Sequence, residues 1–375
     1  MIWAITMPTW GLSMEEGIIV GWRVAEGSPT AAGAELVDIE TSKIANSIEA
    51  REAGVLRRQL AKPGQTVGCG ELIGIIASDE VSDSAIDAFI AQFPRPRPAA
   101  SEGKDASPEP ALVLELPSGI RLRYMIAGSV GSAVVFLHGF GGDSATWLFN
   151  QGHIAENHVT VAFDLPGHGG STKRVDRGSL EELAGSVEQA LDRLELKRMH
   201  LVGHSLGAAI VLALWERRRE RIASVSLLAP FAFGSHVNQS YLNDFISAQR
   251  SRDMQRCLAL LFADPKAIRR EMVEAIVRYK RLDGVTDALA KIAASALRGP
   301  APIEISSTLK TLTKRVLVIR GMHDKVVSVG QIPAGAGLQT LAHSGHMPHM
   351  EEPGHVNRLL LEHFEKADRA DEAIP

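Results

Sequence analysis

"LVGHSLGAA", residues 201–209, is the stretch of this sequence that decides the fold of its larger part. An apolar run leads into a G-x-S-x-G motif at residues 203–207, and small, helix-favouring residues follow. Glycines at both ends of the motif let the chain reverse sharply, which presents Ser205 at the apex and turns the N–H of Leu206 toward any oxyanion formed there. The pattern predicts a strand, a tight turn and a helix with Ser205 as a nucleophile; a tight turn without chemistry is the alternative.

Short, nearly continuous apolar runs alternate with helix-like stretches through residues 111–375. Such runs are typical of strands covered on both faces of a parallel sheet. The segment is therefore predicted to be a doubly wound, mostly parallel α/β domain. Residues 231–297 have helical spacing and no strand-like run, which predicts a helical cap over the carboxyl edge of the sheet. The apolar runs are "SAVVFLHG", "HVTVAFDL", "RMHLVGHS", "ASVSLLAP" and "KRVLVIRG".

A nucleophilic serine needs a base and an acid, and both follow it in the chain. Asp324 comes after the strand-like run "RVLVIRG", and His346 lies within "HSGHMPHMEEP". We expect Asp324 to fix the imidazole tautomer, and His346 to take the serine proton and later return it. The competing histidines, which we interpret as supporting or surface residues, are His323, His343 and His349. Three histidines at a spacing of three can bind a metal, but no cysteine or carboxylate set completes a site, so none is expected.

A glycine-rich loop, "LHGFGG" at residues 137–142, follows the strand-like run "AVVF". Glycines allow the backbone amides of such a loop to turn inward, and we expect the N–H of Phe140 to be the second oxyanion donor beside that of Leu206. His138 in this loop and His168 in "DLPGHGGS" are interpreted as structural residues.

The N-terminal part has a different organisation. Glycines at 17, 27 and 33 recur at 54, 64 and 70, an offset of 37 residues, which predicts two related sheet halves packed as a small flattened barrel over residues 1–80. Lys43, in "DIETSKIANSIEA", falls at the junction of the halves, where a turn would project it from the domain. Residues 81–110 are rich in proline and poor in large apolar residues, so they are predicted to be an extended linker.

Two resemblances follow from these motifs. Residues 1 to about 80 resemble a lipoyl domain in the glycine repeat, "EGS" and "ETSK", which implies covalent lipoate on Lys43. Biotin carrier domains usually flank their lysine with methionines, so Ser42 and Ile44 favour lipoate over biotin. The usual "DKA" of lipoyl domains is replaced here by Ser42-Lys43-Ile44. The remaining residues resemble the α/β-hydrolase family over their full length. The resemblances imply an α/β hydrolase fold with a helical cap, preceded by a small all-β lipoyl domain.

The combination is similar to the dihydrolipoamide acetyltransferase components of acetoin dehydrogenase complexes. It implies an acyltransferase that moves acetyl from a lipoyl arm on Lys43 to coenzyme A through the Ser205 site. The implied partners are a thiamine-dependent acetoin-cleaving component, a flavin-dependent dihydrolipoamide dehydrogenase and a lipoylating enzyme. The HxxxDG segment of other 2-oxo acid dehydrogenase acyltransferases does not occur, so their trimeric core is not expected, and a homo-oligomer stays open.

Two other functions stay open. One is a serine hydrolase, an esterase or a carbon–carbon bond hydrolase, that its lipoyl domain localises to a complex. The other is a carrier and scaffold whose Ser205 site is degenerate.

Bulk composition excludes several classes of protein. The 375 residues carry a formal charge of −4, which is too balanced for binding nucleic acid or an anionic membrane through the overall field. The sequence lacks an uninterrupted apolar run of about 18 residues and a signal-peptide pattern, so we expect a cytoplasmic protein. Cys69 and Cys257 fall in different predicted domains, and a disulfide between them is not expected.

Overall fold

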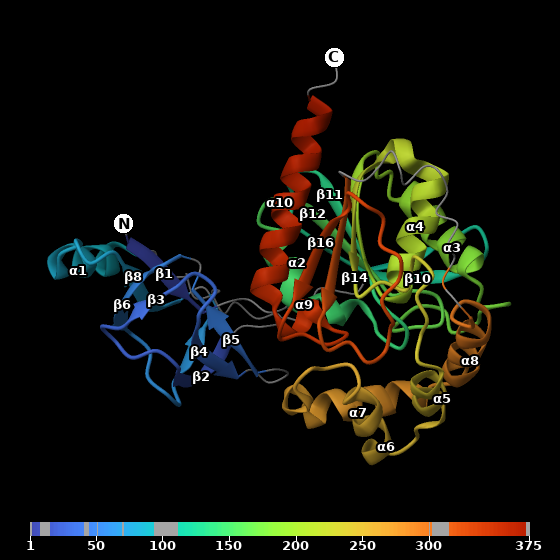
Figure 1. The fold of residues 1–375 in the computed structure, drawn as a ribbon, viewed down its shortest axis with the longest axis horizontal. Helices are drawn as coiled ribbons and strands as arrows, with labels where there is room; N and C mark the ends of the chain where they lie inside the picture. The colour runs from blue at the N-terminus through green and yellow to red at the C-terminus, as the bar shows by residue number, and fades with distance from the viewer. Residues whose placement is uncertain are drawn as a thin grey trace, which may run out of the picture. The chain divides into compact units, whose positions relative to one another are not determined.

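The computed structural model describes residues 2–7, 16–40, 45–50, 52–69, 71–93, 112–299, 301 and 315–372. The chain divides into two compact units, Met1–Pro110 and Ala111–Pro375 (Figure 1). The division falls in the proline-rich segment, whose residues 94–111 lie outside the described ranges.

Short antiparallel strands build the first unit. They form two four-stranded sheets in the orders β1-β8-β6-β3 and β5-β4-β2-β7. Strands β7 and β8 follow β3 and β4 at the 37-residue spacing of the glycine repeat. β3, from the first half of the repeat, pairs in the sheet with β6 and β8, and β7, from the second half, pairs in the sheet with β2 and β4. The strands are β1 (Ile2–Thr6), β2 (Glu16–Trp22), β3 (Pro29–Thr30), β4 (Glu35–Glu40), β5 (Ala45–Glu49), β6 (Gly54–Gln59), β7 (Thr66–Gly68) and β8 (Leu72–Ala77).

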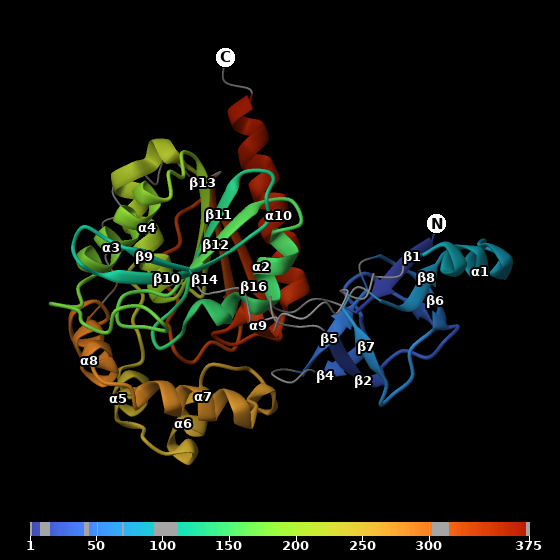
Figure 2. The same ribbon diagram turned by 180° about the vertical axis from the view of Figure 1, so that it is seen from behind.

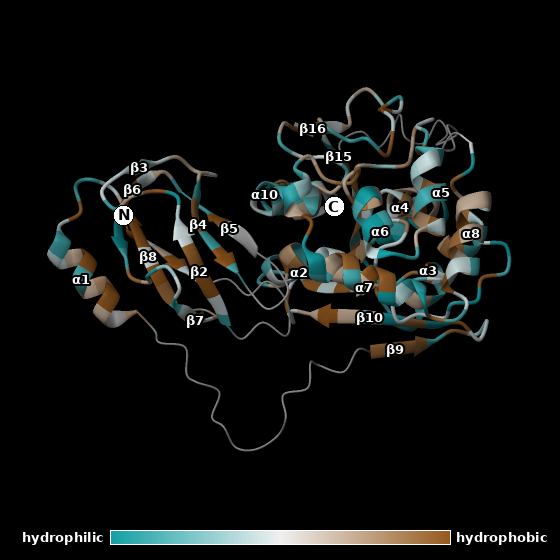
Figure 3. Ribbon diagram, turned by 90° about the horizontal axis from the view of Figure 1, so that it is seen from below, coloured by the Kyte–Doolittle hydropathy of each residue, from teal (hydrophilic) through white to brown (hydrophobic). Residues whose placement is uncertain are grey.

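Alternating side chains of these strands fill the core of the first unit. Ile19, Leu36, Ile39 and Ile73 are completely buried in one apolar cluster. Figure 3 shows the hydrophobic character of strands β2 and β8, and β8 has the sequence LIGIIA. The small all-β domain predicted from the sequence is confirmed.

The expected linker begins later than predicted. Within residues 81–110, helix α1 (Asp83–Gln92) is capped by Ser82, whose hydroxyl accepts from the N–H of Ala85. Ile86 is completely buried against Ile75 and Ala77 of β8. The sequence "SDSAIDAFIAQ" combines a serine cap with apolar residues at helical spacing, and this local signal outweighs the proximity of the prolines.

An eight-stranded sheet forms the centre of the second unit, in the order β16-β15-β14-β13-β11-β12-β10-β9. The pairs from β12 to β16 are parallel, and β9 and β10 extend the sheet in antiparallel fashion. The predicted doubly wound α/β fold is thus confirmed. The strands are β9 (Leu112–Glu115), β10 (Arg121–Ala127), β11 (Ala133–Leu137), β12 (Val159–Phe163), β13 (Met199–His204), β14 (Ile222–Leu228), β15 (Val316–Gly321) and β16 (Gly337–Leu341).

Helices cover both faces of this sheet (Figures 1 and 2). The apolar cluster on one face includes residues of α3 and α4, and the cluster on the other includes residues of α2 and α10. Both faces of the parallel strands are buried, which explains their continuous apolar sequences. The helices are α2 (Leu148–Ile154), α3 (Leu180–Arg193), α4 (Leu206–Arg218), α9 (Pro348–Glu351) and α10 (Pro353–Glu372), with η1 (Ser144–Trp147) and η2 (Arg219–Arg221) as 3-10 helices.

Among the described residues between β14 and β15, four helices form the cap: α5 (Gln239–Ser247), α6 (Ser251–Leu258), α7 (Arg270–Lys280) and α8 (Val285–Ser295), with the 3-10 helix η3 (Pro265–Ala267). Figure 2 shows them grouped at one end of the sheet domain. Residues of the cap and Ser205 at the end of β13 line one cavity, so the cap covers the carboxyl edge of the sheet. In the parts of the chain that the structure describes, no helix has the length and apolar character needed to span a membrane.

Candidate active site

Ser205 lies on a sharp turn between β13 and α4. Its backbone has φ 52° and ψ −113°, a conformation that is strained for a residue with a side chain. A Cβ on Gly203 would lie 2.5 Å from the carbonyl oxygen of Gly207, so a larger residue does not fit there. The N–H of Ser205 donates to the carbonyl of Leu228 on the neighbouring strand at 2.9 Å, which holds the strained turn in place.

His346 and Asp324 form a close pair. His346 Nδ1 lies 2.8 Å from Asp324 Oδ2, and the other carboxylate oxygen accepts from the N–H groups of Val326 and Val327 at 2.8 and 3.0 Å. Burial acts to raise the pKa of Asp324, but the charge and hydrogen bond of His346 and the two backbone N–H groups outweigh it and hold that pKa below its usual range. The ionised carboxylate keeps the proton on Nδ1, so Nε2 is the basic nitrogen, and His346 lines the same cavity as Ser205.

The loop that carries His346 is attached to the cap. The N–H of His346 donates to the carbonyl of Leu261 at 2.7 Å. The carboxylate of Glu351 accepts from the N–H of Gly345 at 2.8 Å and from that of Ala263, in the cap, at 2.6 Å. Burial raises the pKa of Glu351. These contacts fix the position of the imidazole relative to residues 261–263, and nothing in the sequence indicated this role for Glu351.

The competing histidines lie elsewhere. His323 and His343 are exposed, whereas His349 is completely buried. The His349 ring lies between Trp147 and His204, with ring centroids 4.5 and 4.7 Å away, and burial lowers its pKa to about 3. In the described ranges, no group of three or more histidine, cysteine, aspartate or glutamate side chains could hold a metal ion.

His204 links the serine turn to the histidine loop, a role that sequence reasoning missed. Its Nε2 lies 2.8 Å from the carbonyl oxygen of His346, and the two rings are 4.8 Å apart. Burial first, then the neighbouring His349 and His346, lower the pKa of His204 well below its usual value. The neutral ring therefore donates Nε2–H to the His346 carbonyl. Its position inside the G-x-S-x-G motif was the only available signal.

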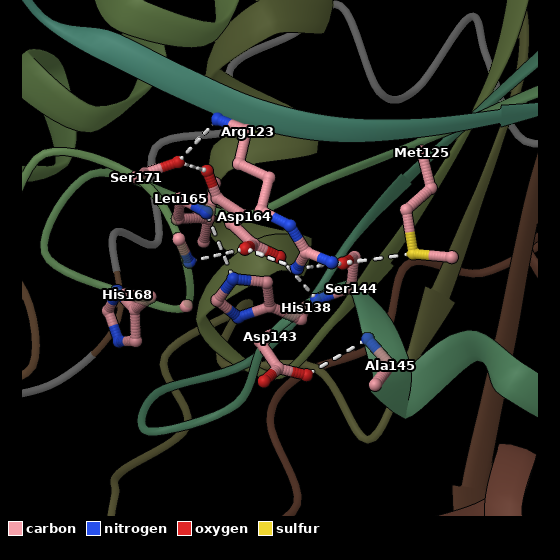
Figure 4. A network of polar contacts seen from close by, with 12 residues as sticks. Arg123, Met125, His138, Asp143, Ser144, Ala145, Asp164, Leu165, His168 and Ser171 are labelled. Carbon is pink, nitrogen blue, oxygen red and sulfur yellow. Dashed lines mark hydrogen bonds and ion pairs between the residues drawn. The ribbon is translucent and has the colours of Figure 1, made fainter. Parts of the chain in front are cut away.

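The loop after β11 holds the backbone of Phe140 beside the serine turn. His138 is completely buried, and its Nδ1–H donates to the Gly139 carbonyl at 2.7 Å while its Nε2 accepts from the N–H of Leu165 at 3.0 Å (Figure 4). Neither the N–H of Phe140 nor that of Leu206 donates to another described residue. Both amides are available for an oxyanion, and His138 has a structural role in the loop.

Asp164 is the centre of the network in Figure 4. This completely buried carboxylate accepts from the N–H groups of Gly170 at 2.6 Å and Ser144 at 2.7 Å and pairs with Arg123 at 3.0 Å. Burial acts to raise its pKa, but these N–H groups and His138 outweigh burial and hold the pKa below its usual value. His168, also buried, donates from Nδ1 to the Pro166 carbonyl at 3.0 Å. The network connects β10, the Phe140 loop and the loop after β12.

Asp164→Asn should lower the free energy of unfolding of the second unit by about 3 kcal/mol at pH 7. The substitution breaks the buried ion pair with Arg123, and it replaces the oxygen that accepts from Arg123 and Gly170 with an NH2 group that cannot accept. The folded-state pKa of Asp164 is depressed, so its stabilisation is present above the unfolded-state pKa near 4 and is lost as the pH falls through the folded value. Urea denaturation of the full chain should show the difference from wild type shrinking below about pH 4. Asp192→Asn, at an exposed pair with Arg221, is the control, with an expected cost under about 1 kcal/mol. Equal losses in both variants would contradict the role of Asp164.

The cavity between the serine turn and the cap has a volume of about 230 Å³. Its floor contains Phe140, Ser205 and His346, and most of the remaining lining is apolar. The apolar contributions of the cap include Leu242, Phe245, Leu258, Leu261, Met272 and Ile276. An apolar cleft with a few polar groups at the reacting end is typical of small-molecule sites and limits the access of water.

Lys43, the expected lipoyl attachment site, lies outside the described residues, as do its neighbours 41–44. The strands on either side are described: β4 and β5 pair with Glu40 opposite Ala45. The connection containing Lys43 therefore begins and ends at one end of a sheet. A lysine in a short connection at the end of a sheet fits the attachment of a covalent arm.

Comparison with known proteins shows which fold families the two units belong to. Residues 134–357 match the model of the alpha/beta hydrolase family, and residues 4–76 match the biotin/lipoyl model described as "Biotin-requiring enzyme". A solved meta-cleavage product hydrolase superimposes with a TM-score of 0.60 at 20% identity over 68% of this chain and 98% of its own, which shows a shared fold. Fold and site together define an α/β-hydrolase preceded by a biotinyl/lipoyl-type domain.

Two curated relatives match almost the whole chain. The dihydrolipoyllysine-residue acetyltransferase component of the acetoin cleaving system of Cupriavidus necator is 40% identical over 364 residues, 96% of each chain. The component of the same description from Pseudomonas putida is 37% identical and covers 97% of this chain and 99% of its own. The chain belongs to the family of dihydrolipoyllysine-residue acetyltransferase components of acetoin cleaving systems, which confirms the resemblance found in the sequence.

Proposed function

We propose that this protein transfers an acetyl group from a lipoyl arm on Lys43 to coenzyme A, as the acyltransferase of an acetoin-cleaving complex. The observation that carries the proposal is the match of almost the whole chain to two curated acetyltransferase components, together with a lipoyl-type unit and a serine site in this chain. Lipoate on Lys43 would supply a dithiol that carries acetyl as a thioester. Residues 94–110 would be the tether that keeps this arm at high local concentration near the cavity.

The first half of the reaction acylates Ser205. His346 Nε2 takes the proton of Ser205 Oγ, and Oγ attacks the thioester carbonyl carbon. The N–H groups of Phe140 and Leu206 bind the oxyanion of the tetrahedral intermediate. The carbon–sulfur bond then breaks, and His346 returns its proton to the departing thiolate, which leaves acetyl-Ser205. Asp324 stabilises the imidazolium through Nδ1 in each step.

The second half releases the acetyl group. His346 takes the proton of the coenzyme A thiol, and the resulting thiolate attacks the carbonyl carbon of acetyl-Ser205. Phe140 and Leu206 again hold the oxyanion, the ester bond breaks, and His346 returns the proton to Ser205 Oγ. The apolar residues of the cap favour the thiol over water at this step, because they leave little space and few partners for a water molecule.

Membership of this family also indicates which enzymes act together with the protein. A thiamine-dependent acetoin-cleaving component would load the arm, a flavin-dependent dihydrolipoamide dehydrogenase would reoxidise it, and a lipoylating enzyme would modify Lys43. We infer a cytoplasmic location for this protein, and the family is what supports it.

A hydrolase localised by its lipoyl domain is the alternative, and the match of residues 134–357 to the alpha/beta hydrolase family is the observation that favours it. One assay separates the two: purified protein receives acetyl-dihydrolipoamide with and without coenzyme A. We expect acetyl-coenzyme A to form at least about tenfold faster than free acetate. Free acetate as the main product with coenzyme A present would indicate the hydrolase, and no turnover would indicate a carrier with a degenerate site.

A further inference from the structure

Asp143 is a carboxylate in the wall of the cavity that the reaction above does not use. It directly follows the glycines of the Phe140 loop and is the N-terminal cap of η1, where one oxygen accepts from the N–H of Ala145 at 2.9 Å. Figure 4 shows this contact, and no described residue donates to the other oxygen. Asp143 lines the cavity, and its second carboxylate oxygen has no hydrogen-bond donor among the described residues.

The cations near Asp143 are engaged elsewhere. Arg123 pairs with Asp164 at 3.0 Å. Lys173 Nζ donates to the backbone carbonyls of His168 at 3.2 Å, Ser171 at 2.7 Å and Gly169. No lysine or arginine of the described ranges forms an ion pair with Asp143. Burial and then the charge of Asp164 raise the pKa of Asp143, while His138, the N–H of Ala145 and Arg123 act in the opposite direction.

Asp143 faces a small space that it shares with the nucleophile. Ser205 lines the same cavity, whose volume is about 230 Å³, so an acyl group on Ser205 occupies the space into which Asp143 opens. Among the described residues, the lining contains no lysine or arginine that could pair with a second carboxylate there. Two carboxylates close together in a medium of low polarity cannot both ionise without strong repulsion, and salt screens this repulsion only weakly.

We propose that Asp143 determines acyl specificity: it admits uncharged acyl groups and rejects acyl groups that carry their own carboxylate, such as succinyl. This inference rests on the proposed function and names the chemical class of its acyl group. A neutral chain meets only the apolar residues of the cap, whereas an acidic chain brings a second carboxylate into the space that Asp143 faces.

The test compares two acyl donors of similar length, succinyl-dihydrolipoamide and pentanoyl-dihydrolipoamide, with coenzyme A as acceptor. Asp143→Asn keeps the size of the side chain and the oxygen that caps η1, but removes the charge. We expect this variant to raise the succinyl-to-pentanoyl ratio of kcat/KM at least about tenfold over wild type. Asp143→Ser, a second capping residue, should change the ratio in the same direction.

Asp264→Asn is the matched control, because Asp264 also caps a 3-10 helix by accepting from the residue two positions on, yet it does not line the cavity. Its ratio should equal that of wild type. An unchanged ratio in both Asp143 variants would overturn the inference. So would an equal loss with both donors, since that indicates a purely structural role.

A binding measurement keeps the inference testable if the proposed function fails. Calorimetry on the full chain should show that Asp143→Asn raises the affinity for pentanoate at least about tenfold while the affinity for pentanamide stays within about twofold. Equal changes for acid and amide would overturn the inference. A wild-type protein that binds pentanamide but forms no acyl-coenzyme A would overturn the proposed function alone.

Discussion

Replacing Ser205 with alanine should lower the rate of acetyl-coenzyme A formation by about a thousandfold or more, because the atom that receives the acetyl group is removed. The turn that presents Ser205 depends on the backbone and on Gly203, so the variant should fold normally. The measurement is acetyl transfer from acetyl-dihydrolipoamide to coenzyme A. Intact mass after mixing with the donor alone should show an acetyl adduct on wild type that the variant lacks.

Ser226→Ala is the control for this experiment. Ser226 is a completely buried serine on β14, the strand beside β13, and its hydroxyl has no hydrogen-bond partner among the described residues. Its removal should leave both rate and adduct unchanged. Transfer retained by Ser205→Ala would rule out the acyl-serine and indicate direct transfer between thiols, while leaving the family assignment intact.

Lys43→Arg should abolish acetoin-dependent acetyl-coenzyme A formation in the reconstituted complex. Arginine keeps the positive charge but lacks the amine that lipoate would acylate, so the tether no longer delivers an arm to the cavity. Tethering typically contributes a factor of about a hundred or more in effective concentration, and a loss of at least that size is expected. Intact mass should show a lipoyl increment on wild type and none on the variant.

Transfer from free acetyl-dihydrolipoamide distinguishes this effect from damage to the serine site, because it should continue in Lys43→Arg. The control variant Lys62→Arg, at an exposed lysine of the same unit, should keep the lipoyl group on Lys43 and full activity. An unmodified Lys43 in wild-type protein from cells that make lipoate would contradict the carrier role.

The sequence was sufficient for features that depend on neighbours in the chain. The turn at Ser205 follows from the glycines on either side, and the parallel sheet follows from apolar runs that are buried on both faces. Asp324 and His346 were predicted from their order after strand-like runs, and the structure places them 2.8 Å apart. Helix α1 was missed because the prolines that follow it were weighed more heavily than its serine cap.

Features that depend on distant contacts could not be predicted from the sequence. His346 was predicted from the sequence in preference to His349, but the physical difference between them depends on distant contacts. His346 lines the cavity, whereas His349 packs on Trp147. The surroundings of Asp143 are another example, because Arg123 on β10 pairs with Asp164 and Lys173 donates to backbone carbonyls.

Two hydrogen bonds, from the N–H of His346 to the Leu261 carbonyl and from the N–H of Ala263 to Glu351, couple this part of the cap to His346, the proposed general base. If this part of the cap moved away to admit the thiol, the backbone N–H of His346 would lose the Leu261 carbonyl as its acceptor. Water that enters the opened site would then meet an imidazole that is no longer held in position to act as a base. Faster exchange of the backbone amide proton of His346 would report this opening in hydrogen-exchange experiments.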